Sequence, residues 1–187
     1  PPAELDIPNK LQGPSTQHWL GTDSLGRDIA SQLMVGAQSA LLVGLLAVGL
    51  GLSVGLALGL LAAARRGWVD ELLMRTVDFG FAFPALLTAI LLAAAQGPGL
   101  ATSIIAIGLF NIPVFMRVTR AAALTVWARD YILAARLSGL STWAITRSHV
   151  LPNIAAPLIV QATIQCALAI LAEAALAFLG LGTQAPQ

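Results

Sequence analysis

The chain has 187 residues, of which 57% are apolar and only 10% are charged, and its mean hydropathy is +0.82. Soluble domains carry about 25% charged residues, so this composition excludes a soluble enzyme, a nucleic-acid-binding module and a disordered tail. The formal charge of +1 provides no basic field for nucleic acid. The single cysteine, Cys166, excludes a disulfide framework and a Cys-based metal site. The composition therefore predicts an all-α membrane protein.

The first membrane span is predicted over residues 39–64, after a polar-to-mixed segment at 1–38. The span has no charge and no proline, and at 1.5 Å per residue it is about 39 Å long, enough to cross a hydrocarbon core of roughly 30 Å with tilt. Three glycines spaced by four share one face of it: Gly51, Gly55 and Gly59. This stripe either lets another helix approach closely or only reflects the glycine content of membrane helices.

Three more spans are predicted over residues 76–95, 99–116 and 154–182. The turn at 96–99 (Gln-Gly-Pro-Gly) separates the second span from the third. Asp78, close to the start of the second span, is expected to pair locally with Arg75 or to cap the helix, with a pathway role as the alternative.

The basic residues predict the orientation. Eight of the ten lie in two loops: Arg65, Arg66 and Arg75 in one, and Arg117, Arg120, Arg129, Arg136 and Arg147 in the other. Because positive residues mark cytoplasmic loops, both loops are assigned to the cytoplasm and residues 1–38 to the outside.

The longest stretch between spans, residues 117–153, is predicted to be a structured cytoplasmic loop. Tyr131–Ser138 is predicted as a helix that stops at Gly139, and Ser141 as the N-cap of a second short helix. Leu151-Pro152-Asn153 then closes the loop. Its apolar residues favour docking to a protein partner; the alternative is an amphipathic helix lying on the membrane surface.

The same loop resembles the EAA loop of ABC-importer permeases. Five residues match that pattern at its spacing: Ala134, Ala135, Gly139, Leu151 and Pro152. Leu133 and His149 depart from the Glu and Ile of the generic motif, but such departures are typical of the peptide and nickel permeases.

Three further stretches resemble the same subfamily. They are Gly-Thr-Asp-x-x-Gly-Arg-Asp at 21–28, Ala82-Phe83-Pro84, and Phe-Leu-Gly-Leu-Gly at 178–182. By this resemblance the chain is similar to the second, C-type permease of dipeptide, oligopeptide or nickel importers. That family has six spans, so the first and last helices are expected to be missing from this sequence.

The resemblance implies a single type I ABC-importer transmembrane domain over 1–187, in a bacterial inner membrane. It implies a homologous second permease, two cytoplasmic ATPases and an external binding protein as partners, with ATP and Mg bound in the ATPases and no cofactor in this chain. Peptides, glutathione or nickel chelates are the implied substrates. The residues expected to couple to the ATPases are Ala134, Ala135, Arg136, Ser138, Gly139, Leu140 and Trp143.

The sequence allows two roles for each of the remaining polar residues. Gln161, Gln165 and Glu173 are candidates for the translocation pathway, with interhelical hydrogen bonding or a helix-end role as alternatives. Asp23, Arg27 and Asp28 are candidates for contact with a binding protein, or for an ion-paired or solvated external loop. An ion-coupled secondary transporter is the alternative function, and an intramembrane hydrolase is disfavoured because no span contains a histidine.

Overall fold

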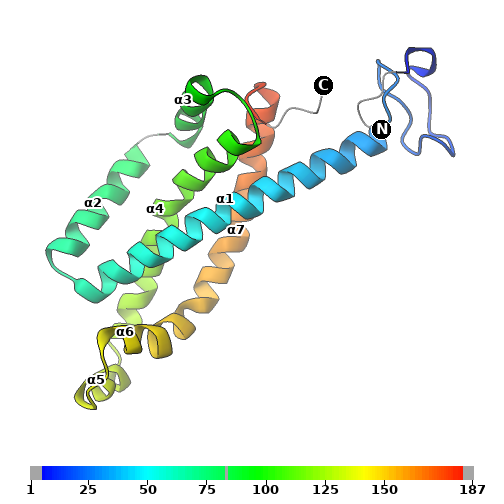
Figure 1. The fold of residues 1–187 in the computed structure, drawn as a ribbon. Helices are drawn as coiled ribbons and strands as arrows, with labels where there is room; N and C mark the ends of the chain where they lie inside the picture. The colour runs from blue at the N-terminus through cyan, green and yellow to red at the C-terminus, as the bar shows by residue number, and fades with distance from the viewer. Residues whose placement is uncertain (1–5, 83, 183–187) are drawn as a thin grey trace.

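The computed structural model describes residues 6–82 and 84–182, and regular structure within these ranges is helical apart from one isolated bridge between Thr22 and Asp28. The elements are η1 (Ile7–Asn9), α1 (Ile29–Arg65), α2 (Trp68–Ala82), α3 (Ala85–Gln96), α4 (Leu100–Trp127), α5 (Asp130–Leu137), α6 (Thr142–Ile145), η2 (Thr146–Val150, a π-helical turn) and α7 (Leu151–Phe178). Figure 1 shows α1 crossing the front of α4 and α7, with α5 and α6 at one end and the N-terminal segment at the other.

Three helical segments of the described chain are long and apolar enough to cross a membrane: Ile29–Arg65, Leu100–Trp127 and Thr142–Phe178. A fourth span results if α2 and α3, which are bent relative to each other by 84°, count as one. The predicted span over 76–95 is therefore not one helix, because it crosses the bend between α2 and α3. Pro84 stands in an extended conformation at the N-cap of α3, where a residue without an N–H interrupts no helical hydrogen bond. Phe83 lies outside the described residues.

Helix α1 begins ten residues before the predicted span. Its start is fixed by Asp28, whose carboxylate accepts hydrogen bonds from the backbone N–H of Ser31 (2.9 Å) and from the Ser31 hydroxyl (2.5 Å). With 37 residues the helix is about 55 Å long, well beyond the thickness of a hydrocarbon core. Hydropathy located the apolar part of this helix and missed its polar first turns.

The glycine stripe of α1 packs directly against α4, which confirms the close-approach interpretation. A Cβ at Gly55 would lie 2.6 Å from Cβ of Phe115, and one at Gly59 would lie 2.7 Å from the carbonyl oxygen of Met116. Real Cβ atoms do not come this near, so only glycine allows the two backbones their present separation. The phenyl ring of Phe115 is fully buried in the resulting core.

Two ion pairs connect α2 to α4. The guanidinium of Arg120 donates to both carboxylate oxygens of Asp70, and Arg117 donates to Asp78 while lying 4.7 Å above the ring of Phe81. The expected pairing of Asp78 with Arg75 is wrong, because Arg75 binds Glu71 one turn away on its own helix (2.6 Å).

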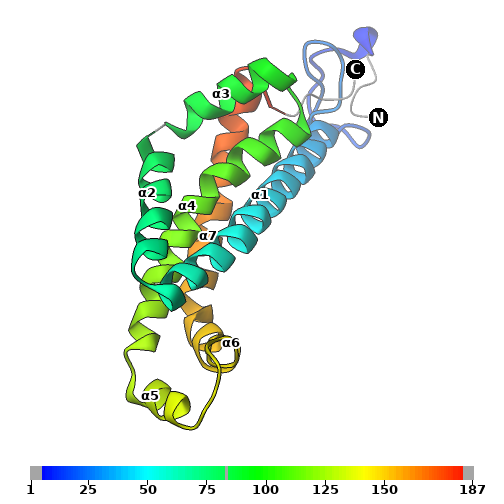
Figure 2. The same cartoon turned by 60° about the vertical axis from the view of Figure 1, so that its left-hand side comes forward.

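Both of the remaining spans continue through segments that were predicted to be loop. Helix α4 runs unbroken through Pro113 to Trp127, so residues 117–127 are its last turns. Residues 142–178 are likewise continuous, because the π-helical turn η2 connects α6 to α7, and Pro152 lies directly after this turn. Leu151-Pro152-Asn153 is therefore part of a helix. Figure 2 shows α1, α2, α4 and α7 side by side, with α3 across one end.

Candidate functional site

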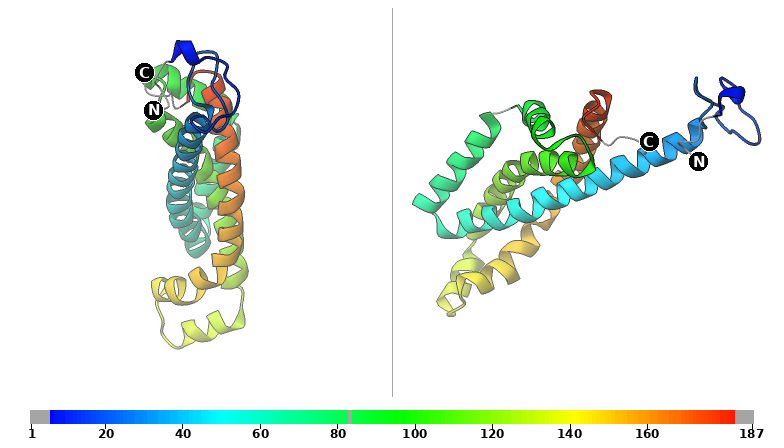
Figure 3. Two further views of the ribbon diagram at one scale, coloured as in Figure 1. Left: turned by 90° about the vertical axis from the view of Figure 1, so that its right-hand side faces the viewer. Right: turned by 45° about the horizontal axis from the view of Figure 1, so that its top comes forward.

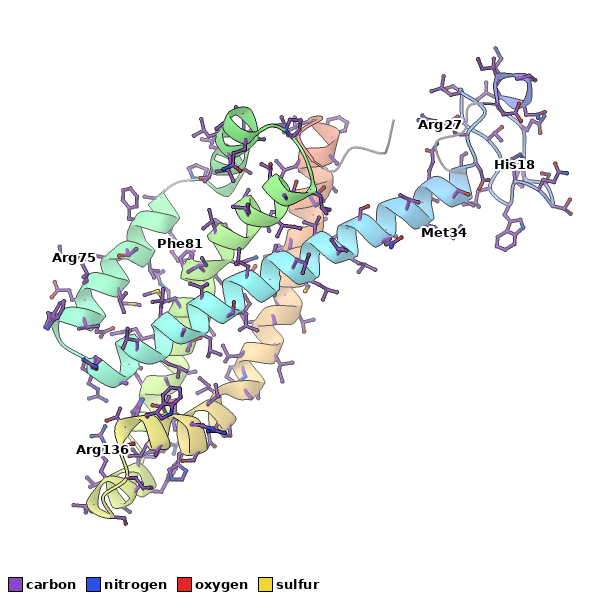
Figure 4. The ribbon with its side chains drawn as sticks, viewed as in Figure 1. His18, Arg27, Met34, Arg75, Phe81 and Arg136 are labelled. Atoms are coloured by element: carbon purple, nitrogen blue, oxygen red, sulfur yellow. The ribbon has the colours of Figure 1, made fainter. Side chains whose placement is uncertain are left out.

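The elbow, defined as α5, the turn that follows it and α6 (residues 130–145), occupies the end of the molecule farthest from residues 6–28. Figure 3 shows the elbow extending past the spans in both views. In Figure 4, Arg136 lies at that end, whereas His18 and Arg27 lie at the other. The basic loops and the N-terminal segment thus emerge at opposite ends of the helices.

Local hydrogen bonds define the shape of the elbow. Helix α5 ends where Gly139 takes a left-handed φ of +84°, and the N–H of Leu140 then donates to the carbonyl of Ala135 (3.2 Å), as in a glycine-terminated helix. The hydroxyl of Ser141 accepts a hydrogen bond from the N–H of Ala144 (3.2 Å) and caps α6. The predicted helix is confirmed with its bounds shifted by one residue to 130–137, and its stop at Gly139 and the cap at Ser141 are confirmed as predicted.

The elbow has an inner and an outer side. Ile132 and Ile145 are buried in the core of the chain, and Ala135 is 8% exposed. Of the seven predicted coupling residues, Ala135 therefore serves packing within the chain. The other six are exposed: Ala134, Arg136, Ser138, Gly139, Leu140 and Trp143.

Two leucines that sequence reasoning missed dominate the outer side. Leu137 is 81% exposed and Leu133 is 59% exposed, and they are one helical turn apart on α5. Their spacing was a visible signal, because Leu133 and Leu137 alternate with the buried Ile132 and Ala135. They form an apolar surface on a helix of eight residues. Trp143, on the neighbouring helix α6, is 73% exposed.

Aromatic contacts hold the elbow onto the spans. The guanidinium of Arg136 lies 4.9 Å from the ring centroid of Trp127 at the end of α4, in a cation–π contact. Tyr131 of α5 meets His149 of η2 edge to face, with ring centroids 6.2 Å apart. Arg136 is thus positioned by this chain and remains exposed.

The three pathway candidates lie on α7 and face the chain's own bundle. Gln165 and Glu173 are buried and Gln161 is half-buried. The residues after α7 fold back over Glu173, because a Cβ at Gly182 would lie 2.9 Å from its Oε1. Their role in a pathway stays a prediction.

Asp23, Arg27 and Asp28 shape the N-terminal segment through contacts within it and with the start of α1. Burial would raise the pKa of Asp23, but hydrogen bonds from the backbone N–H groups of Arg27 and Leu25 and from the side chains of Gln32 and Arg27 outweigh it and lower that pKa to about 2. Hydrogen bonds from Ser31 lower the pKa of Asp28, and the nearby His18 lowers it further. Both carboxylates are therefore ionised at neutral pH and bound within the segment, and contact with a binding protein stays a prediction.

These features define a polytopic helical membrane protein with an ordered element beyond its spans at one end. The family model described as binding-protein-dependent transport system inner membrane component matches residues 55–187. The chain belongs to this family of inner-membrane permeases.

Curated relatives support the assignment over nearly the whole chain. The chain is 45% identical over 98% of its length to the dipeptide transport system permease protein DppC of Alkalihalophilus pseudofirmus. It is 47% identical over 97% to the di/tripeptide permease DppC of Pseudomonas aeruginosa and 41% identical over 97% to the glutathione permease GsiD of Pectobacterium atrosepticum. The chain spans 60% of the length of each of these relatives.

The fold is also similar to a solved structure of the MetNI methionine ABC transporter in an inward-facing conformation. The TM-score is 0.76, with 20% sequence identity, over 83% of this chain and 77% of the other. The predicted all-α ABC-importer transmembrane fold is confirmed by this likeness.

Proposed function

We propose that the chain is the membrane-spanning permease subunit of an ATP-driven importer and forms half of its translocation pathway. In this proposal the elbow and the start of the following helix, residues 131–153, dock onto a cytoplasmic ATPase. Movement of the ATPase pair then rocks the spans between outward-open and inward-open states. ATP hydrolysis and its Mg belong to the partner subunits, and this chain itself is not an enzyme.

The observation that carries the proposal is the apolar outer surface of the elbow, at the end that the arginines assign to the cytoplasm. Leu133 and Leu137 of α5 are exposed there, whereas Ile132 anchors α5 and Ile145 anchors α6 in the core. A rigid element with an exposed apolar face transmits force to the spans only if a partner covers that face.

The other proposed partners are a homologous second permease, an external substrate-binding protein and the surrounding lipid bilayer. The substrate class is peptides or a related small solute such as glutathione or a nickel chelate. Relatives named for dipeptide, di/tripeptide and glutathione transport support this class.

The test is the substitution Leu137→Glu in the assembled transporter. It places a charge on the outer side of α5 and removes apolar area, so we expect the ATPase subunits to be retained about tenfold less well on purification. ATP-driven uptake into reconstituted vesicles should fall with it. Leu11→Glu is the matched control, because Leu11 is 72% exposed in the external segment and should leave ATPase retention unchanged.

Equal ATPase retention in the two variants would refute docking through α5. An ion-coupled secondary transporter, the alternative function, would need no ATPase at all. Purification of an active transporter without any nucleotide-binding subunit, and uptake driven by an ion gradient, would establish that alternative.

A further inference from the structure

A groove of about 640 Å³ runs between the C-terminal half of α1 and the segment formed by α6, η2 and the start of α7. One wall is formed by α1 and includes Leu60 and Leu61, and the other includes Trp143 and Leu151. Most of the lining side chains are aliphatic. Arg65, the last residue of α1, stands at one end of the groove, and Ser53 lies at the other.

The length of the groove corresponds to one leaflet of a bilayer. Ser53 and Arg65 are twelve residues apart on one helix, which is about 18 Å along its axis. Half of a hydrocarbon core is about 15 Å. An extended acyl chain would therefore fit along the α1 wall of the groove, starting from Arg65.

The charge at the mouth of the groove has no acidic partner in the part of the chain that the structure describes. Among the described residues, no carboxylate lies within ion-pair distance of Arg65 or of its neighbour Arg66. Four other arginines do have such partners: Arg27, Arg75, Arg117 and Arg120. The mouth therefore presents positive charge at the cytoplasmic end, where membranes expose anionic headgroups.

Trp143 completes the site. It lines the groove and yet is 73% exposed, and indole side chains favour the boundary between headgroups and hydrocarbon. A basic residue and a tryptophan above an aliphatic groove are the chemistry that recognises a phospholipid with a negative headgroup.

We infer that this groove binds one acyl chain of an anionic phospholipid of the cytoplasmic leaflet, with its headgroup at Arg65 and Arg66. The bound lipid would touch α1 and the elbow at once, so that lipid composition would influence how firmly the elbow is held. The inference depends on the orientation of the spans, and it does not depend on the transported substrate.

The test uses the assembled transporter in nanodiscs of phosphatidylcholine that contain a minor fraction of a photoreactive lipid with a diazirine on its acyl chain. The probe is phosphatidylglycerol in one arm and phosphatidylcholine in the other, and labelled peptides are mapped by mass spectrometry. We expect the phosphatidylglycerol probe to label 53–65 and 143–151 preferentially. Arg65→Gln should lower that preference about fivefold, because one basic residue near an anionic surface contributes about 1 kcal/mol.

Two controls separate headgroup recognition from general contact with lipid. A second apolar cavity of about 540 Å³, lined by Leu73 of α2, Leu91 of α3 and Phe110 of α4 among others, has no charged lining residue and should be labelled equally by both probes. Arg75→Gln removes an arginine that already binds Glu71 and should leave the labelling of the groove unchanged.

The second variant fills the groove with a larger side chain. Leu61 is 41% exposed, so Leu61→Trp should fold and should reduce labelling by both probes, whereas Leu45→Trp, on an exposed part of α1 outside the groove, should not. Equal labelling of the groove by the two probes would overturn the inference. Labelling absent from the assembled transporter, as expected if a neighbouring subunit fills the groove, would overturn it as well.

Discussion

The seam between α1 and α4 and the elbow beyond the spans use glycine for opposite purposes. In the seam, Gly55 and Gly59 bring two backbones together, and any side chain there would strike the neighbouring helix. In the elbow, Gly139 has open space around its Cα and is required by its positive φ alone. Gly55 and Gly59 therefore serve helix packing, whereas Gly139 serves a turn of the backbone.

The seam and the elbow also differ in how far they bury their apolar side chains. Phe115 in the seam is fully buried by this chain, whereas Leu137 in the elbow is left 81% exposed. The seam is therefore packed within this chain, whereas the outer side of the elbow is covered only in the proposed complex with a partner. This contrast predicts that substitutions in the seam change the stability of the spans, and that those on the outer elbow change assembly.

The largest expected effect is at the seam. Gly55→Leu places a side chain against Phe115 and the backbone of Met116, so α1 must separate from α4 and the free energy of unfolding should fall by about 3 kcal/mol. Gly49→Leu on the same helix has no atom within 4 Å of its Cβ position and should change stability by less than about 1 kcal/mol. Unfolding in mixed detergent micelles measures both, and equal losses would contradict the packing role of the stripe.

The next effect concerns the attachment of α2 to α4. Asp70 is mostly buried where it binds Arg120, so Asp70→Asn should lower the free energy of unfolding by about 2 kcal/mol. Its neighbour Glu71 binds Arg75 on an exposed face, and Glu71→Gln should lower it by about 0.5 kcal/mol. The same unfolding measurement compares the two, and a larger loss for the exposed pair would show that α2 is not held by Asp70.

The smallest effect on the spans is expected in the elbow. Gly139→Ala forces a side chain into a left-handed backbone and should cost about 1–2 kcal/mol locally, without changing the unfolding of the spans. Hydrogen exchange in α5 and α6 should rise by about tenfold. Gly13→Ala, in an open position with no positive φ, is the control. A lowered stability of the spans in the Gly139 variant would show that elbow and seam are one cooperative unit.

Features that depend on residues close together in the sequence were predictable from the sequence alone. Composition and hydropathy identify an all-α membrane protein, the arginines separate its two ends, and the end of α5 at Gly139 and the cap at Ser141 follow from local hydrogen bonding. The glycine stripe was also visible, although its partner helix was not.

Only the tertiary structure decided which distant residues meet. Asp78 binds Arg117 although Arg75 is nearer in sequence, because the register of α2 on α4 determines that pair. Packing also buries Ala135 and exposes Leu137 on the same short helix, and it keeps α4 helical to Trp127 where the charges predicted a loop. Capping and turning act within a few residues and are encoded locally, whereas register, burial and the groove beside Arg65 exist only once the helices have packed.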